Sequence, residues 1–342
     1  MFTSRPHPPN PPLPLLISGV AGVTGYNAFH YFRSHFDDQV IGIRQVNNWP
    51  LRGLGIVPCN AEDRDGLEKL FEQYQFAAVL NCAGNCALKS CELDPALARR
   101  TNVESVENLV HIIDPDQTRL VHLSIDLVFS GVGNGGYTES CQTDPVTVYG
   151  KTMVEAEKIV LAASSRNSVL RISLPMGVSF NGHAGAIDWI QARFKQSKPA
   201  TLYYDEIRTP TYTDCLNELC RTVLGSDLSG IFHAGGPRRL SLYQIAQIVN
   251  RVGGYDPDHL MGCPRIEAGP VPPRAGNVTL DSSKLAAAVG FAPFDPWPAN
   301  EEFVPTHDQW HRERSGIGPG SPELLAQALY LNPWRAATRL HG

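Results

Sequence analysis

The sequence contains no apolar run that approaches the ~18 residues a transmembrane helix needs, so we expect no membrane span. It has little excess charge of either sign: 29 Lys and Arg residues against 34 Asp and Glu residues give a formal net charge of −5. Without a basic excess, there is no electrostatic reason to expect nucleic acid as a partner. The opening segment, "MFTSRPHPPNPPLP", lacks the apolar core of a secretory signal, and we therefore expect a cytoplasmic protein.

Cysteine is not scarce, but the patterns that give cysteine a structural role are absent. The eight cysteines are spread along 342 residues, and no two are spaced as CxxC. This distribution excludes a disulfide framework, and we expect free, buried thiols at Cys82, Cys86 and Cys91. His307 and His311 are spaced to share a helix face, but two histidines do not complete a zinc site, so no metal is predicted.

The first half of the chain alternates short apolar runs with longer amphipathic stretches. The apolar runs predict strands at residues 13–18, 39–44, 77–83, 119–125 and 168–173. The amphipathic stretches predict helices at residues 25–36, 64–74, 96–113 and 151–164. Strands that alternate with helices in this way form a parallel sheet covered on both faces. The predicted fold class is therefore α/β, with a Rossmann-type doubly wound parallel sheet.

Changes in composition divide the chain into four parts. Six prolines among the first 14 residues predict a disordered, partly polyproline-like lead over residues 1–12. Residues 13–173 form the predicted Rossmann-type domain, for which the segments described below indicate NAD(P) binding. Glycine- and proline-rich turns beyond it predict a smaller, mixed α/β substrate lobe over residues 174–300, from which the chain crosses back to the first domain. Residues 301–342 form a C-terminal extension that the pattern does not place.

A glycine-rich turn follows the first predicted strand. "ISGVAGVTGYNAF" places Gly19, Gly22 and Gly25 between that strand and the next helix, with Val23 and Thr24 inside the turn. Glycines allow the backbone to approach a pyrophosphate, and the helix N-terminus supplies unpaired N–H groups and a positive dipole end. In this strand-turn-helix setting we predict a dinucleotide cofactor. A tight turn without a ligand is the alternative.

The end of the second predicted strand indicates which dinucleotide is bound. An acidic residue there would hold the ribose 2′-hydroxyl of NAD, but "VIGIRQVNN" contains none and offers Arg44 instead. An arginine at this place suits the 2′-phosphate of NADP. We therefore predict NADP as the cofactor. NAD, with Arg44 as an ordinary surface charge, remains the alternative.

Several segments along the chain carry a family resemblance. They are "GVAGVTG", "LNCAGNCALKSCELDPALARRTNV", "HLSIDLVFSG", "YTESCQTDPVTVYGKT", "DEIRTPTYTDCL", "GIFHAGG" and "PPRAGNVTLDSSKL". In this order the series resembles the extended short-chain dehydrogenase/reductases, specifically the dTDP-4-dehydrorhamnose reductase (RmlD-like, sugar-nucleotide-binding) branch, over roughly residues 13–295. The same branch includes the regulatory beta subunit of methionine adenosyltransferase, which resembles a reductase but serves as a partner protein.

The resemblance implies a catalytic triad of which one member is present. The family's tyrosine, which protonates the carbonyl oxygen as hydride arrives, matches Tyr149. Its lysine lowers the tyrosine pKa and holds the nicotinamide ribose, but it aligns with Met153. The serine or threonine that binds the carbonyl oxygen aligns with Ile125. Lys151 cannot easily replace the lysine, because it lies about 200° around the helix from Tyr149. The triad is therefore degenerate at Met153 and Ile125.

Two neighbours of Ile125 are candidates for a replaced catalytic role. Ser124 offers the nearest hydroxyl, but adjacent residues of a strand face opposite sides, so Ser124 would need a local twist. Asp126 could donate a proton only if its pKa were raised. Together with Tyr149, these two residues form the predicted catalytic set.

The resemblance also assigns residues around the reaction centre. Besides Tyr149, the residues implied to contact the cofactor are Ala83, Gly84, Asn102 and Pro175. The residues implied to contact the substrate are Ile125, Met176, Arg208 and Arg274. For the two arginines, an ordinary surface charge is the alternative.

Three functions are compatible with these residues. The first is an NADP-dependent reductase of a nucleotide-linked 4-keto sugar or a similar small molecule, with altered or weak catalysis. The second is a catalytically impaired, cofactor-binding regulatory or partner protein, which Met153 and Ile125 favour. The third is a non-redox enzyme that reuses the scaffold. A homodimer is compatible with the sequence, which does not decide the oligomeric state.

Overall fold

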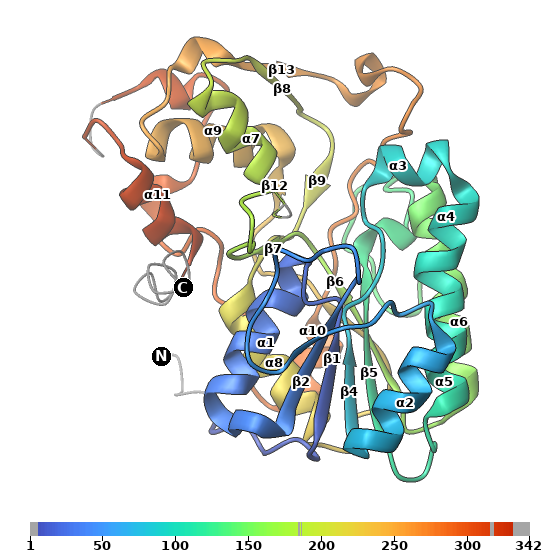
Figure 1. Cartoon of the computed structure of the whole chain (residues 1–342). Coiled ribbons are helices and arrows are strands. Elements are labelled where there is room, and N and C mark those ends of the chain that lie inside the picture. The colour runs from blue at the N-terminus through green and yellow to red at the C-terminus, as the bar shows by residue number, and fades with distance from the viewer. Residues whose placement is uncertain (1–5, 184, 186, 315–317, 331–342) are drawn as a thin grey trace.

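A seven-stranded parallel sheet forms the centre of the molecule (Figure 1). In this computed structural model the described residues are 6–183, 185, 187–314 and 318–330. The strands lie in the order β11-β6-β5-β4-β1-β2-β3. Their bounds are β1 Leu15–Ser18, β2 Val40–Arg44, β3 Ile56–Pro58, β4 Ala78–Asn81, β5 Arg119–Ile125, β6 Ser168–Ile172 and β11 Gly230–Ala234. The predicted Rossmann-type α/β fold is confirmed, and the five predicted strands agree with the observed ones to within two residues at either end.

Helices cover both faces of the sheet. Their bounds are α1 Val23–Phe36, α2 Arg64–Tyr74, α3 Leu88–Leu93, α4 Pro95–Arg99, α5 Ser105–Ile112, α6 Val148–Ala163, α8 Thr213–Leu224 and α10 Ser283–Val289. Leu15, Leu16 and Ile17 of β1 are all fully buried, although neighbours on a strand point to opposite faces. Leu15 and Ile17 join the apolar cluster of α1 and α8, whereas Leu16 joins that of α2, α5 and α6. Burial on both faces explains why the strands read as unbroken apolar runs.

Two helices differ from their predicted form by more than two residues or by an interruption. The helix predicted over residues 96–113 is interrupted, because α4 leads into a π-helical turn, η2 Arg100–Glu104, before α5 begins. Helix α6 begins three residues earlier than predicted, because Thr147 caps it: its Oγ1 accepts a hydrogen bond from the backbone N–H of Gly150 at 3.0 Å. Tyr149 therefore lies in the first turn of α6.

The 3₁₀ turns are η1 Asp37–Gln39, η3 Asp126–Val128, η4 Pro257–His259, η5 Arg265–Ala268, η6 Glu301–Phe303 and η7 Trp310–Arg312.

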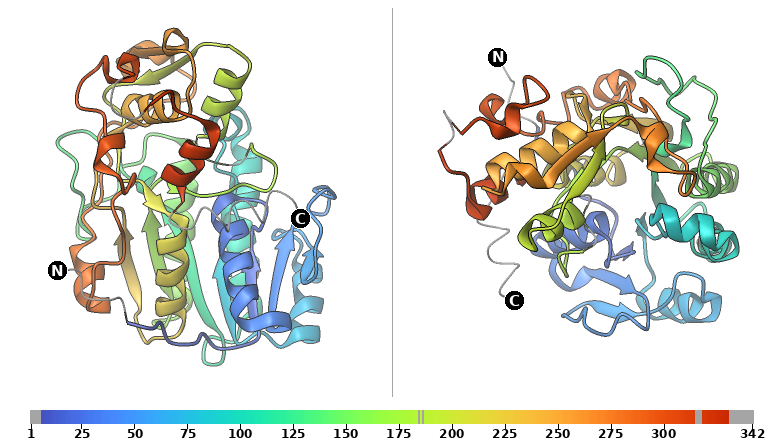
Figure 2. Two further views of the ribbon diagram at one scale, coloured as in Figure 1. Left: turned by 90° about the vertical axis from the view of Figure 1, so that its left-hand side faces the viewer. Right: turned by 90° about the horizontal axis from the view of Figure 1, so that it is seen from above.

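A smaller lobe lies beyond the carboxyl ends of the central strands (Figure 1, Figure 2). Its elements are β7 Pro175–Met176, α7 Asp188–Lys195, β8 Ala200–Tyr203, β9 Ile207–Arg208, β10 Thr211–Tyr212, β12 Leu240–Ser241, α9 Leu242–Val252 and β13 Leu260–Cys263. Between them the chain returns to the Rossmann domain, where α8 packs against α1 and β11 pairs with β6. Among the described residues, no helix is both long and apolar enough to cross a membrane.

Both ends of the described chain pack against the folded body. The side chain of Arg221 on α8 donates to the carbonyl oxygen of Pro9 at 3.4 Å and to Asn10 Oδ1 at 2.8 Å. Residues 9 and 10 of the predicted lead therefore contact α8, whereas residues 1–5 lie outside the described residues. At the other end, α11 Pro322–Leu329 packs against α9, and the Tyr212 hydroxyl donates to the carbonyl oxygen of Ala328 at 3.1 Å. The described part of the extension therefore belongs to the smaller lobe.

Candidate functional site

The glycine-rich turn between β1 and α1 takes its shape from two close backbone contacts. Gly19 has a φ of +69°, and a Cβ there would lie 2.5 Å from the carbonyl oxygen of Cys82. A Cβ at Gly25 would lie 2.3 Å from the carbonyl oxygen of Gly19. Both positions therefore require glycine, because the protein's own backbone leaves no room for a side chain. Helix α1 begins at Val23 rather than at the predicted Gly25, so Val23 and Thr24 lie in its first turn.

Gly22 differs from Gly19 and Gly25, because the surrounding described residues leave room for a side chain at this position. Its φ is −79°, and the nearest neighbour of an added Cβ would be the carbonyl oxygen of Gly19, at an ordinary 3.5 Å. Gly22 is also the N-cap of α1 without a side-chain hydrogen bond, and the first turn of the helix carries no acidic residue. The N–H groups of the first turn of α1 lack intrahelical partners, and no side chain at Gly22 covers them. This arrangement fits an anionic pyrophosphate.

Arg44 closes β2 and organises the loop that follows it. Its Nε donates to the carbonyl oxygen of Leu51 at 2.6 Å, and its Nη1 donates to the carbonyl oxygens of Gln45 and Val46 at 2.9 and 3.2 Å. The guanidinium therefore lies at the strand end where a dinucleotide places its adenosine ribose. Part of its donor capacity is used by its own loop.

Asn102, in the π-helical turn, connects the loop after β4 to α6. Its Oδ1 accepts a hydrogen bond from the backbone N–H of Asn85 at 2.6 Å, and its Nδ2 donates to Thr152 Oγ1 at 2.9 Å. Thr152 Oγ1 in turn donates to the carbonyl oxygen of Tyr149 at 2.8 Å. A Cβ on Gly84 would come within 3.0 Å of Asn102 Oδ1. Asn102 therefore fixes the spacing between the predicted cofactor loop and α6.

The loop after β4 also holds Ala83 and the cysteine-rich segment. The backbone N–H of Ala83 lies 3.2 Å from both Ser18 Oγ and Asn81 Oδ1, which ties the loop to β1 and β4. Cys91 is buried as predicted, whereas Cys82 is half-buried and Cys86 is exposed. The prediction of burial was wrong for Cys86, because it lies in the loop before α3 rather than inside a helix face.

Tyr149 and Met153 occupy successive turns of α6, and Met153 lies at the position where the family resemblance implies a lysine. Met153 is only 3% exposed and packs in the apolar core. Burial raises the pKa of Tyr149 well above its ordinary value, and Cys86 and Asp126 add to that rise, whereas Arg208 opposes it. Tyr149 therefore keeps its proton at neutral pH.

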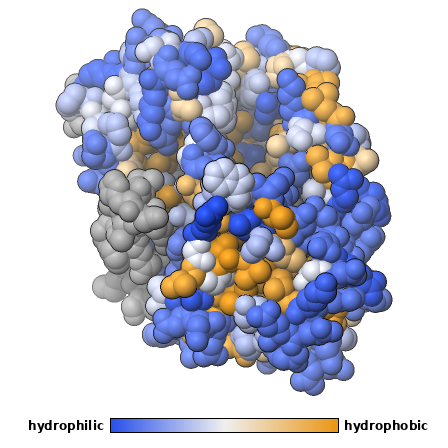
Figure 3. All heavy atoms as spheres, in the orientation of Figure 1, coloured by the Kyte–Doolittle hydropathy of each residue, from blue (hydrophilic) through white to orange (hydrophobic). Residues whose placement is uncertain are grey.

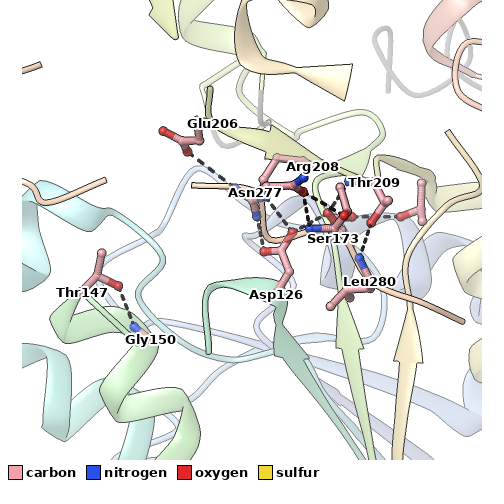
Figure 4. Close-up of polar contacts among 11 residues, drawn as sticks. Asp126, Thr147, Gly150, Ser173, Glu206, Arg208, Thr209, Asn277 and Leu280 are labelled. Carbon is pink, nitrogen blue, oxygen red and sulfur yellow. Dashed lines mark hydrogen bonds and ion pairs between the residues drawn. The ribbon is translucent and has the colours of Figure 1, made fainter. Parts of the chain in front are cut away.

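Asp126 is fully buried directly after β5, and three donors point at its carboxylate (Figure 4). Arg208 of β9 donates from Nε to Oδ2 at 2.6 Å and from Nη2 to Oδ1. The Ser173 hydroxyl donates to Oδ2. Burial raises the pKa of Asp126, while Arg208 and Ser173 oppose the rise. Since all three contacts are donors, the geometry favours the ionised carboxylate and makes Asp126 the group that holds Arg208, rather than a proton donor.

Ser124 points toward α6, not toward this ion pair. Its hydroxyl donates to Glu157 Oε1 at 2.5 Å, and Glu157 Oε2 accepts from Arg171 Nη2 at 2.7 Å. All three side chains are buried. No local twist redirects Ser124, so the structure does not bring its hydroxyl together with Asp126. Ile125, between them, lies in the apolar core.

A buried carboxylate that the sequence reasoning missed, Glu206, lies beside two of the predicted substrate residues. Glu206 Oε1 is 3.9 Å from Arg208 Nη1, and Glu206 Oε2 is 3.6 Å from Arg274 Nη1. The guanidinium of Arg274 also stacks over the ring of Tyr203 at 4.7 Å. The available signal was Glu206 itself in "DEIRTPTY", two residues before Arg208.

A cavity of about 150 Å³ opens beside Arg274 in the smaller lobe. Met176 and Arg274, two predicted substrate residues, line it together with apolar and aromatic side chains that include Trp189 and Leu202. Pro175 lies at the same junction, because β7 pairs with β10 there. Figure 3 shows the molecular surface hollowed between the smaller lobe and the sheet domain.

The architecture and the site correspond to a known family. The chain matches the family described as the RmlD substrate binding domain over residues 14–304. The chain belongs to the RmlD family. The match spans the sheet and most of the smaller lobe and ends before α11. It confirms the RmlD-like branch of the extended short-chain dehydrogenase/reductases that the segment series predicts.

The chain is similar in sequence to proteins of two kinds. The methionine adenosyltransferase 2 subunit beta of Xenopus laevis is 28% identical over 253 residues, covering 70% of this chain and 75% of the relative. A dTDP-4-dehydrorhamnose reductase of Mycolicibacterium smegmatis is 27% identical over 242 residues, covering 70% and 72%. Among solved structures, the dTDP-4-dehydrorhamnose reductase of Bacillus anthracis in complex with NADP has a TM-score of 0.70 at 17% identity, covering 83% of this chain and 95% of that one. The structural likeness shows the shared fold.

Proposed function

We propose that this RmlD family member binds NADP(H) and reduces the 4-keto group of a nucleotide-linked sugar, at a rate far below that of an intact reductase. The observation that carries the proposal is the open backbone at Gly22, which the protein's own packing does not require and a pyrophosphate does. Arg44 at the end of β2 supports NADP over NAD. The relatives named as dTDP-4-dehydrorhamnose reductases support the substrate class.

In the proposed reaction, Tyr149 is the one member of the family's triad that is present. When bound, NADPH supplies the hydride. Tyr149, which keeps its proton at neutral pH, donates that proton to the carbonyl oxygen as negative charge develops there. Met153 and Ile125 supply neither the ammonium nor the hydroxyl that would support this transfer. Loss of one donor to a developing oxyanion lowers the rate by about 10²–10³, and two such losses need not add. From a median turnover near 10 s⁻¹, roughly 10⁻² to 10⁻⁴ s⁻¹ would remain.

Restoring the missing groups tests the proposed reaction. NADPH oxidation in the presence of a dTDP-4-keto sugar should be barely above background for the wild type. The Met153→Lys, Ile125→Thr double variant should be faster by about 10² or more. Lys151→Met is the matched control, because Lys151 is exposed on the same helix and its loss should leave the rate unchanged. A wild-type turnover near an ordinary 10 s⁻¹ would show that another residue has taken over both roles.

A second candidate function is that of a cofactor-binding partner protein. It is favoured by the absent lysine and hydroxyl, and by relatives that are named as subunits of methionine adenosyltransferase. In this case the double variant would gain no activity, while the wild type would co-elute with the methionine adenosyltransferase catalytic subunit in size-exclusion chromatography. Separate elution of the two proteins, with and without NADP, would contradict the partner function.

A further inference from the structure

We propose that Glu206 competes with the anionic part of the ligand for Arg274. Its carboxylate lies between Arg208 and Arg274 until a ligand phosphate displaces it. The inference rests on the proposed function for its ligand class, a nucleotide-linked sugar. It goes further by naming the residue that sets how strongly the diphosphate can bind.

The contacts of Glu206 are those of a carboxylate that is close to its partners but not hydrogen-bonded by them. Its distances of 3.9 Å to Arg208 and 3.6 Å to Arg274 exceed hydrogen-bond length. Oε2 of Glu206 and Nε of Arg274 are both buried and have no hydrogen-bond partner. A buried charge that lacks its hydrogen bonds is costly, so a ligand that satisfied Arg274 better would be favoured over Glu206.

Arg274 is the partner that a ligand can reach. Its side chain is 24% exposed, against 3% for that of Glu206, and it lines the cavity of about 150 Å³. Stacking on Tyr203 holds the guanidinium in place. A guanidinium fixed in this way presents a planar set of donors that matches the oxygens of a phosphate. The cavity therefore reaches Arg274, one of the two cations beside Glu206.

The neighbouring charges do not remove the conflict between Glu206 and a phosphate. Glu206 faces three cations, Arg208, Arg274 and Arg265, and one anion, Asp126. Arg208 is already committed to Asp126 by two hydrogen bonds. Arg265 is committed to Asp205, with an Nη1–Oδ2 distance of 3.0 Å. An incoming diphosphate would meet the charge of Glu206 at Arg274, the cation that remains.

Protonation of Glu206 would relieve this repulsion. Burial raises the pKa of Glu206, and Asp126 adds to the rise, while Arg208, Arg274 and Arg265 oppose it. A bound diphosphate adds negative charge and raises this pKa further, so ligand binding takes up a proton. By linkage, affinity for the diphosphate must then increase as the pH falls.

The test is a calorimetric titration with dTDP-glucose, a diphosphate diester, on protein saturated with NADP, from about pH 5, just above the ordinary pKa of a glutamate, to about pH 8.5. Wild-type affinity should fall as the pH rises. Glu206→Gln should bind about 10-fold or more tightly than the wild type near the upper pH, with little dependence on pH. Asp205→Asn is the matched control: this carboxylate is adjacent and more exposed, and its loss should leave the wild-type pH dependence in place.

A second variant keeps the test decisive if Glu206→Gln folds poorly. Arg274→Gln should weaken dTDP-glucose binding throughout this pH range, because it removes the cation for which Glu206 and the ligand phosphate compete. Tight wild-type binding that is independent of pH and unchanged in Glu206→Gln would overturn the role of Glu206 but leave the proposed function standing. If no variant binds dTDP-glucose at any pH, the nucleotide-linked substrate is overturned together with this inference.

Discussion

Met153 illustrates how one side chain can remove chemistry and leave the fold intact. It lies in the same apolar cluster as Tyr149, where its flexible thioether side chain fills the volume of a lysine stem. Without an ammonium group, burial holds the pKa of Tyr149 well above its ordinary value. Packing at this position depends on volume, whereas catalysis depends on charge. The two requirements can therefore be lost separately.

This difference predicts distinct pH–rate profiles for the wild type and the Met153→Lys, Ile125→Thr variant. The raised pKa keeps the wild-type Tyr149 protonated, so its slow reduction rate should not fall up to about pH 9. In the variant, the introduced ammonium lowers the tyrosine pKa, and the proton donor is lost at a lower pH. NADPH-dependent rates measured across this range should therefore decline on the alkaline side only in the variant. Parallel alkaline limbs would contradict this account of Tyr149.

Arg44→Ala should lower the affinity for NADP by about 10-fold or more and leave that for NAD nearly unchanged. A charge-assisted hydrogen bond to the 2′-phosphate contributes about 1.5–3 kcal/mol, and only NADP carries that phosphate. Isothermal titration with both dinucleotides separates this effect from damage to the loop that Arg44 supports, since loop damage would weaken both. Arg52→Ala, in the same loop, is the control. Unchanged NADP affinity in Arg44→Ala would show that Arg44 serves the loop alone.

At the scale of the element, the β1–α1 turn separates glycines that shape the backbone from one that leaves space. Gly22→Val should abolish NADP binding while the fold survives, because the larger side chain would fill the place of the pyrophosphate. Gly22→Ala is the matched variant, since its Cβ meets only the Gly19 carbonyl oxygen at 3.5 Å. It should fold normally and lose less affinity. NADP titration paired with thermal unfolding measures both properties, and full binding by the valine variant would refute the cradle.

At the scale of the whole molecule, local pattern predicted the sheet because burial on both faces leaves a run such as Leu15, Leu16 and Ile17 entirely apolar. The missing triad members at positions 125 and 153 could also be identified, since Ile125 and Met153 each lie within a recognisable family segment. The contact of Glu206 with Arg274 could not, because it joins residues far apart in sequence that meet only through the fold. The start of α6 was misplaced because the cap at Thr147 was not recognised.

The origin of strand β11 has a consequence for synthesis. This strand pairs with β6, yet much of the smaller lobe lies between the two in the chain. During translation, β6 remains an unpaired edge strand until β11 has been made. Helix α8, which covers the same sheet, also arrives late. Unpaired edges of this kind invite aggregation. The central sheet therefore cannot be completed until the part of the lobe that lies between β6 and β11 in the chain has been made.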